Sequence, residues 1–316
     1  MQRMHPTGLA VLVIGMLWPA VAHATMVQSA HGLVDSSCVR QIPNGANVSG
    51  DTGEVTLDDG TVVVSAAEAA ASSASCRASG VDSDPGGGAS GWSAETTAWA
   101  ISGSGYGGLK QYDEIQVGFW VPEPPDNPSD QNYQLFWCGL ENFPTGGGNW
   151  VNVIQPELRW SSTTGFYITT ESFDNPEYYN LDDYSPNENV SQGDYLKCTI
   201  TQIGSNEWNL NMTDETSGAY TGFHWYPGTG SNWGPYSWAQ LSVYEAYTSA
   251  CDGLFKSNYA FFEPLVLEQA GPNWNSFNDV LPLVTVEPGY ASGCSFDAYW
   301  SPWSSGDPYS YLSWSY

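Results

Sequence analysis

The stretch Val151-Asn152-Val153-Ile154-Gln155-Pro156-Glu157 shows which fold class the chain adopts. It is short and rich in β-branched residues, as β-strands are. Side chains alternate between the two faces of a strand, so Val151, Val153, Gln155 and Glu157 share one face. The stretch is therefore predicted as a strand with an amide and a carboxyl group on a partly apolar face.

A second stretch has the same character: Leu241-Ser242-Val243-Tyr244-Glu245-Ala246-Tyr247. Alternation groups Glu245 with Leu241, Val243 and Tyr247. A carboxylate on such an apolar face is costly to bury unless it is paired, and its pKa is often raised. Such a group suits general acid–base chemistry. The alternative is that Glu245 lies in solvent at the end of a strand.

Similar short runs follow one another between Trp92 and Gln269, punctuated by Gly, Pro, Asn and Asp. Helical periodicity is nearly absent. Many short strands separated by turn signals indicate an all-β protein, an antiparallel β-sandwich or jelly roll. The predicted strands are Thr97–Ile101, Glu114–Val121, Tyr133–Leu140, Asn152–Trp160, Gly165–Glu171, Tyr195–Ile203, Trp208–Thr213, Gly222–Trp225, Leu241–Tyr247 and Phe261–Leu267.

Composition divides the 316 residues into four parts. Residues 1–24 are typical of a signal peptide, with an apolar run and the cleavage site Ala22-His23-Ala24, so we expect a secreted protein. Residues 25–90 end in a Gly-rich segment and are expected to be a propeptide or a flexible N-terminal extension. Residues 91–269 should form the β-sandwich domain. Residues 270–316 should be a C-terminal extension or additional edge strands.

The chain is strongly acidic, with 34 Asp and Glu against 7 Lys and Arg. Nucleic acid and an anionic membrane surface would be repelled, so neither is expected as a partner. We expect a monomer. At low pH the carboxylates become neutral and few cations remain to repel one another, so the composition tolerates acid. It would equally suit high salt or simply keep the protein soluble.

The six cysteines suit up to three disulfides in an exported chain, and the sequence does not choose their pairing. Only His31 and His224 follow the predicted cleavage site, so neither a metal site nor a cofactor is expected. His224 lies between two aromatic residues, which favours a packing role over a catalytic one. The segment Gly146-Gly147-Gly148 lacks the lysine of a phosphate-binding loop and suits a hairpin tip. Carboxylate and amide chemistry on strands remains.

Four segments carry a resemblance to a known family. They are, in chain order, Trp137-Cys138-Gly139-Leu140-Glu141, Val153-Ile154-Gln155-Pro156-Glu157, the strand Ser191–Ile200, and Ser242-Val243-Tyr244-Glu245-Ala246-Tyr247. In this order they resemble the motifs of the eqolisin glutamic peptidases, which are secreted acid endopeptidases with a concanavalin-A-like β-sandwich. The resemblance covers residues 96–268. The chain departs from the family at Pro156-Glu157, where the family has Thr-Gly, at Ser242, where it has Trp, and at Glu141, where it has Asp.

The resemblance implies a polypeptide substrate and a catalytic pair, Gln155 and Glu245. Glu245 would act as general base on a water, and Gln155 would orient that water and donate its amide N–H to the developing oxyanion. The protonated Glu245 would then pass its proton to the leaving amine. The resemblance further implies that Trp137, Glu141 and Glu157 line the substrate-binding site.

Two other functions remain open from the sequence. A retaining glycoside hydrolase needs two carboxyl groups about 5–5.5 Å apart, which Glu157 and Glu245 could supply. A non-catalytic carbohydrate-binding protein is the other alternative, because exposed rings among the 15 Trp and 19 Tyr could stack on sugars.

Overall fold

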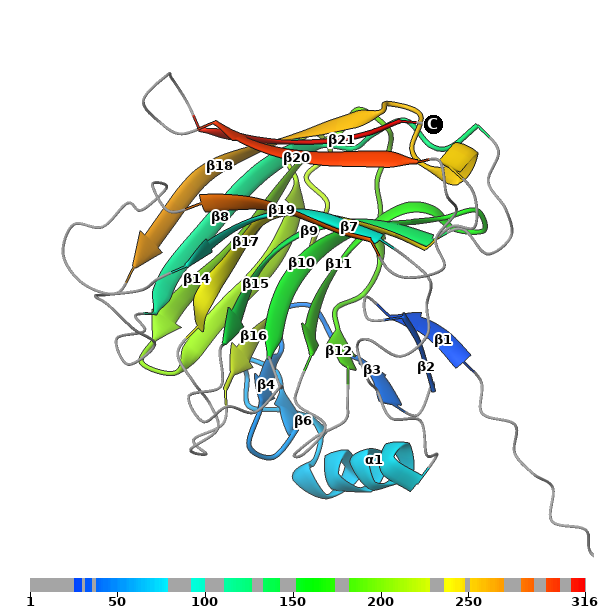
Figure 1. Ribbon diagram of the computed structural model, residues 1–316. Coiled ribbons are helices and arrows are strands. Elements are labelled where there is room, and N and C mark those ends of the chain that lie inside the picture. Colours follow the sequence, from blue (N-terminus) through cyan, green and yellow to red (C-terminus); the bar gives the residue numbers. More distant parts are fainter. Residues whose placement is uncertain are drawn as a thin grey trace, which may run out of the picture.

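Figure 1 shows the protein as a computed structural model. The residues that the structure describes are 26–29, 32–35, 38–78, 92–99, 111–126, 133–142, 152–173, 182–227, 236–247, 251–269, 280–286, 294–301 and 308–315. The predicted signal peptide, His31 and the Gly146-Gly147-Gly148 segment lie outside these ranges.

Two large sheets pack face to face (Figure 1). Within the described ranges, the first, sheet I, has nine strands. In spatial order they are β19 (Val280–Val286), β7 (Trp92–Trp99), β17 (Tyr236–Tyr247), β9 (Tyr133–Asn142), β10 (Val153–Ser161), β11 (Gly165–Phe173), β12 (Asp182–Tyr184) and β3 (Val39–Gln41), with β13 (Glu188–Asn189) also paired to β11.

The second sheet, sheet II, has ten strands within the same ranges. In spatial order they are β20 (Ser295–Ser301), β21 (Tyr309–Ser315), β18 (Tyr259–Gln269), β8 (Tyr112–Trp120), β14 (Tyr195–Gly204), β15 (Glu207–Asp214), β16 (Tyr220–Tyr226), β4 (Asn47–Ser49), β5 (Val55–Thr56) and β6 (Val62–Val64). The hairpin β1 (Met26–Ser29) and β2 (Gly32–Asp35), the helix α1 (Ala66–Ala78) and a short 3₁₀ helix (Cys251–Gly253) complete the described elements. The predicted all-β sandwich is confirmed.

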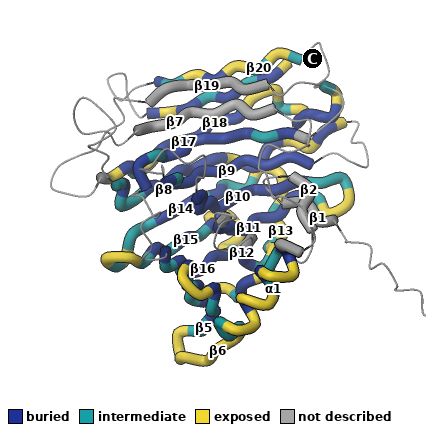
Figure 2. Tube along the Cα trace, turned by 60° about the horizontal axis from the view of Figure 1, so that its bottom comes forward, coloured by how far each residue is buried: buried dark blue, intermediate teal, exposed yellow. Residues whose placement is uncertain are grey.

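The core between the sheets is aromatic. The ring of Phe136 on β9 lies 4.5 Å from Tyr244 and 5.3 Å from Phe255, measured between ring centroids. Phe262 of sheet II meets Phe136 edge-on at 5.5 Å. Aromatic pairs at such distances add to the free energy gained by burying their surface. Figure 2 shows buried residues along the central strands of both sheets. This core fixes which side of each strand faces inward.

The N-terminal segment is built into both sheets. Strand β3 adds to β12 and strand β4 adds to β16, and both pairs are parallel, whereas the other pairs in the described ranges are antiparallel. The disulfide Cys38–Cys76 ties this segment to α1. Residues 38–78 thus join the sandwich through β3 and β4, within the segment 25–90 for which the sequence predicted a propeptide or a flexible extension. Whether this segment is a propeptide stays a prediction.

Helix α1 was missed by the search for periodic apolar residues. It begins with a capping box, in which the Ser65 backbone N–H donates to Glu68 Oε2 at 2.8 Å and the Glu68 N–H donates to Ser65 Oγ at 3.3 Å. The Ala/Ser run that follows suits a helix but carries almost no apolar stripe. The capping pair was the available sequence signal.

All six cysteines form disulfides, and the other two are Cys138–Cys198 and Cys251–Cys294. The first of these joins β9 of sheet I to β14 of sheet II through the core. At the C-terminal end, β19 lies at the edge of sheet I, and β20 and β21 lie at the edge of sheet II. No helix in the described part of the chain is both long and apolar enough to span a membrane.

Candidate functional site

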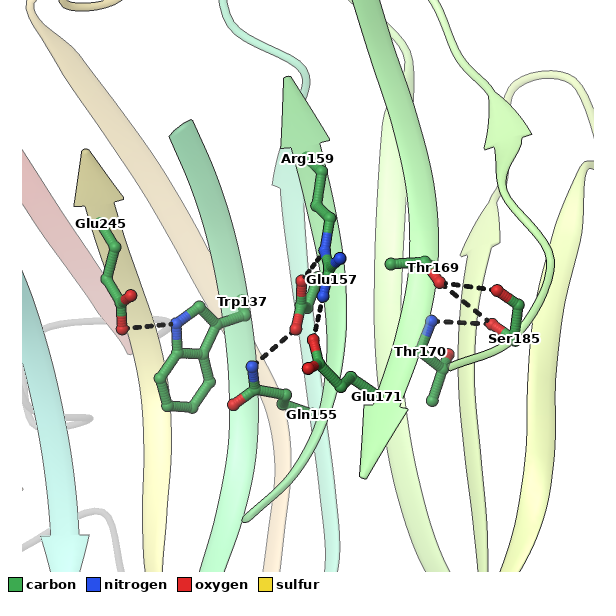
Figure 3. A network of polar contacts seen from close by, with 9 residues as sticks. All are labelled: Trp137, Gln155, Glu157, Arg159, Thr169, Thr170, Glu171, Ser185 and Glu245. Atoms are coloured by element: carbon green, nitrogen blue, oxygen red, sulfur yellow. Dashed lines mark hydrogen bonds and ion pairs between the residues drawn. The ribbon is translucent and has the colours of Figure 1, made fainter. Parts of the chain in front are cut away.

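The outer face of sheet I, which points away from sheet II, carries the side chains that the sequence singled out. Alternation along β10 turns Ile154 and Leu158 into the core and leaves Gln155 and Glu157 on the outer side. Arg159 follows on the same strand, and the other strands of sheet I bring further side chains to this side, as Figure 3 shows: Trp137, Glu171 and Glu245. We call this surface the site face.

A buried ionic network lies on the site face. Arg159 forms ion pairs with Glu157 on its own strand and with Glu171 on β11 (Figure 3). All three side chains are buried. Burial acts to lower the pKa of Arg159, but the charge of Glu157 raises it, and the pKa lies well above the ordinary arginine value. The guanidinium therefore stays charged, and two carboxyl groups share one cation.

This network holds Gln155 in one orientation. The Gln155 Nε2 donates to Glu157 Oε1 at 2.6 Å, and the residue is fully buried. Its Oε1 is buried and has no hydrogen-bond partner within the described ranges; the same holds for Oε1 of Glu171, which lies directly opposite Gln155 on β11. A buried acceptor without a donor is costly. Both oxygens are therefore placed to accept a hydrogen bond from a water or a substrate N–H.

A second amide lies on the far side of β9. Gln240 of β17 pairs in register with Gly139 of β9. On β10, Gln155 lies midway between Val153 and Glu157, which pair with Glu141 and Trp137, so Gln155 also lies opposite Gly139. The Gln240 Nε2 donates to Glu141 Oε1 at 3.0 Å, and its own Oε1 has no partner in the described part of the chain. Gly139 keeps the space between the two amides free of a side chain of its own.

Trp137 covers this glycine. A Cβ atom added to Gly139 would lie 2.7 Å from the indole of Trp137 and 3.1 Å from the backbone oxygen of Ile154. The indole Nε1 donates to Glu245 Oε1 at 3.2 Å. The ring lies beside Glu245 of β17 (Figure 3) and extends over the space above Gly139.

The two residues of the predicted catalytic pair share the site face but do not meet. Glu245 lies in one cross-strand row with Leu135 and Arg159, and Gln155 is four residues along β10 from Arg159. With about 4.8 Å between strands and 3.3 Å per residue, the Cα atoms of Gln155 and Glu245 are about 16 Å apart. Side chains stand roughly perpendicular to a sheet, and the Trp137 indole fills the space between them. The structure therefore does not place both around one water.

Glu141 lies closer to Gln155. It pairs with Val153, two residues before Gln155 on the adjacent strand. Residues in such a diagonal relation have Cβ atoms about 7–8 Å apart, within reach of long side chains and of a shared water. Glu141 is only partly buried. It is thus the carboxylate that the geometry brings nearest to the unpaired oxygen of Gln155, apart from the ion-paired Glu157 and Glu171.

The pairing needed for a retaining glycoside hydrolase is not present. Glu157 is engaged by Arg159 and Gln155, whereas Glu245 accepts from Trp137. Trp137 pairs in register with Glu157 and separates it from Glu245. No group of three or more His, Cys, Asp or Glu side chains among the described residues is arranged to hold a metal ion.

Sequence reasoning missed Arg159, Glu171 and Gln240. Arg159 continues the alternation of Gln155 and Glu157 and could have been found by extending that pattern. Gln240 could not, because a register shift between Gln240 and Val243 places these two residues on the same face despite their odd separation. His224 lies on β16 beside β4, with its Nδ1 3.1 Å from Asn47 Oδ1, away from the site face.

No protein-family model matches the chain, and no curated protein matches it. Solved structures with a similar fold include scytalido-glutamic peptidase with a peptide-based transition state analog, at 13% identity and a TM-score of 0.48, and the same peptidase with a transition state analog inhibitor, at 12% and 0.47. SCP-B, a member of the eqolisin family of peptidases, was solved with the tripeptide Ala-Ile-His and gives 13% and 0.45. Each match covers 72% of this chain and 98% of the other.

Proposed function

We propose that this chain is a secreted acid endopeptidase that hydrolyses peptide bonds with an amide, a carboxyl group and one activated water on the site face. The observation that carries the proposal is the buried, unpaired Oε1 of Gln155, fixed in place by the bond from its Nε2 to Glu157. The order of the motifs along the chain, which resembles that of the glutamic peptidases, supports the same reaction.

In this mechanism Gln155 positions the water. The first O–H of the water donates a hydrogen bond to Gln155 Oε1. Its second O–H points toward the carboxylate that will accept the proton. The lone pair of the water then points toward the substrate carbonyl carbon. One N–H of Gln155 is occupied by Glu157, and the other remains to donate to the developing oxyanion. The ionic network of Glu157, Arg159 and Glu171 keeps the amide from rotating.

The general base is the point at which geometry and resemblance differ. The resemblance assigns this role to Glu245, which would require the Trp137 indole to leave its place. The register favours Glu141, whose carboxylate is already held by Gln240 at 3.0 Å and lies diagonally across from Gln155. Glu141 therefore accepts the proton from the water and then donates it to the leaving amine. Glu245 then acts as a positioning residue for Trp137.

The test compares kcat/KM on a denatured protein substrate between about pH 2 and 5, where carboxyl groups titrate. We expect Glu141→Gln to lose about 10²–10⁴-fold, as expected for a missing general base. Gln155→Ala should lose about 10²–10³-fold, and Glu245→Gln less than about tenfold, mainly through KM. Glu215→Gln, which changes an exposed glutamate outside the site face, is the matched control.

Two results would change this assignment. Loss of activity in Glu245→Gln with retention in Glu141→Gln would return the general base to Glu245. Cleavage by the wild type that survives Gln155→Ala unchanged would remove the site face from the mechanism.

A further inference from the structure

The outer face of sheet II exposes large aromatic side chains. Their exposed fractions are 55% for Trp120, 52% for Tyr299, 47% for Tyr259, 44% for Phe261 and 36% for Tyr309. Single exposed apolar residues are common on protein surfaces, but a contiguous group of them marks a binding surface more often than chance. The question is whether these rings are scattered or form one surface.

The strand register places three of these rings in one line with two further aromatic residues, Tyr311 and Tyr195. Tyr299 pairs with Tyr311, and Tyr311 pairs with Phe261. Phe262 pairs with Phe119, which sets Phe261 beside Trp120, and Trp120 pairs with Tyr195. One aromatic residue from each of five adjacent strands therefore lies in a single cross-strand row, about 19 Å long at 4.8 Å per strand. We call these five residues the aromatic row: Tyr299, Tyr311, Phe261, Trp120 and Tyr195.

Contacts between neighbouring rings support the row. The centroids of Phe261 and Tyr311 are 4.9 Å apart, and those of Trp120 and Tyr195 are 4.8 Å apart. Tyr259 stacks on Tyr311 at 5.8 Å, and Tyr309 lies 6.0 Å from Phe261. These contacts restrict ring rotation before any ligand arrives, which lowers the entropy cost of binding.

The size of the surface argues against a second copy of the chain as its occupant. With 150–250 Å² for each aromatic side chain, the exposed fractions of Trp120, Tyr299, Tyr259, Phe261 and Tyr309 together correspond to roughly 350–600 Å². A stable protein dimer buries about 800 Å² on each partner. The exposed rings alone thus cover less area than a stable dimer buries, and their line has the length and narrow shape to take a linear ligand.

The net charge of the chain excludes an anionic ligand. The chain has a formal net charge of −27 at pH 7, so an anionic polymer or membrane would be repelled. The Tyr195 hydroxyl donates to Glu263 at 2.9 Å, and burial followed by that hydrogen bond raises its pKa to about 12, so the phenol stays neutral. Rings with neutral hydroxyl tips match a chain of sugars, whose C–H faces stack on aromatic rings while the sugar hydroxyls meet polar tips.

We infer that the outer face of sheet II binds a neutral polysaccharide along the aromatic row. The row crosses five strands, so the sugar chain lies across the sheet rather than along a strand. This inference is independent of the proposed peptidase activity, because no member of the row belongs to the site face.

The test measures depletion of the full chain from solution by microcrystalline cellulose, chitin powder and a neutral particulate glucan. We expect retention on at least one of these polymers. Trp120→Ala, Phe261→Ala and Tyr299→Ala should each weaken the apparent Kd about tenfold or more, as removing a central aromatic contact does at other interfaces. Tyr220→Ala is the matched control, because Tyr220 is 41% exposed on β16 of the same sheet but outside the row. Thermal unfolding followed by circular dichroism checks that the variants fold.

Several outcomes would overturn the inference. One is no retention on any of the three polymers, and another is equal retention of wild type and row variants. A concentration-dependent dimer in analytical ultracentrifugation that Phe261→Ala dissociates would assign the row to a second copy instead. The variant Glu141→Gln should bind as the wild type does, which separates this result from the fate of the peptidase proposal.

Discussion

The outer faces of the two sheets reverse the usual surface composition in opposite ways. The site face of sheet I buries an ionic network of Glu157, Arg159 and Glu171, while the outer face of sheet II exposes rings such as Trp120 and Phe261. Charged residues are almost never fully buried unless paired, and large contiguous apolar patches are uncommon on soluble proteins.

The comparison shows that each face departs from the usual surface composition of soluble proteins at the place where we propose that it binds a ligand. On the site face, buried charge restricts the rotation of Gln155 and leaves one oxygen without a partner. On the other face, rings that could have packed in a core remain in solvent. The predictions below compare the loss of unfolding free energy that substitutions on each face cause.

The largest effect is expected from Arg159→Met. The substitution leaves Glu157 and Glu171 buried without their cation, and breaking a buried ion pair in this way costs about 3–5 kcal/mol. Chemical denaturation near neutral pH would measure the loss of unfolding free energy. Lys197→Ala, which removes the partner of Glu215 at 2.9 Å on sheet II, should cost less than about 1 kcal/mol because that pair is partly exposed. Equal losses in the two variants would contradict the contrast between the faces.

An intermediate effect is expected at two glycines that each lie under an aromatic ring. In Gly139→Ala the new Cβ would lie 2.7 Å from Trp137 and 3.1 Å from the Ile154 backbone, neither of which is free to move in a buried site. Overpacking of this kind costs about 1–3 kcal/mol. In Gly118→Ala the Cβ would contact the hydroxyl end of Tyr195, the far end of a partly exposed side chain that can shift at the cost of its contacts with Trp120 and Glu263, so we expect a smaller loss. Urea unfolding of both variants provides the comparison, and a larger loss for Gly118→Ala would contradict it.

The smallest effect concerns acid tolerance. Burial raises the pKa of Asp183 more than its ion pair with Arg40 lowers it, so the folded protein favours the neutral carboxyl group relative to the unfolded chain. The stability contribution is therefore full below the ordinary Asp pKa of about 3.9 and is lost as pH rises through the folded pKa. Asp183→Asn should remove this decline.

Unfolding midpoints of wild type and Asp183→Asn across that pH range would show the change in slope. Asp126→Asn is the control, because it removes a carboxyl group that is 62% exposed beside Lys256. A wild-type stability that rises with pH relative to Asp183→Asn would reverse the sign and refute the argument.

Much of the fold could be predicted because alternation and turn signals are local. The predicted strand Asn152–Trp160 matches β10 at Val153–Ser161, and the predicted Tyr195–Ile203 matches β14 at Tyr195–Gly204. The pairing of β3 and β4 with distant strands could not be predicted, because a strand of three residues carries almost no pattern.

The sequence predicted which site residues share a face of one strand, but not which side chains from different strands lie close together. Gln155 and Glu157 follow from alternation, and the structure joins them by a hydrogen bond. The distance from Gln155 to Glu245 depends on register across three strands, and the register shift at Gln240 also decides which side chains face outward. Register and bulges arise from tertiary packing, so they have no signature in a single strand.

Cys138 lies between Trp137 and Gly139 on β9, yet it points inward and is bonded to Cys198 of β14, the strand that also carries Tyr195. The disulfide thus links β9, which carries Trp137 and Glu141 of the site face, to β14, which carries Tyr195 of the aromatic row. If the aromatic row binds a solid while the site face cleaves polypeptides, this disulfide keeps the two sheets covalently joined during both events.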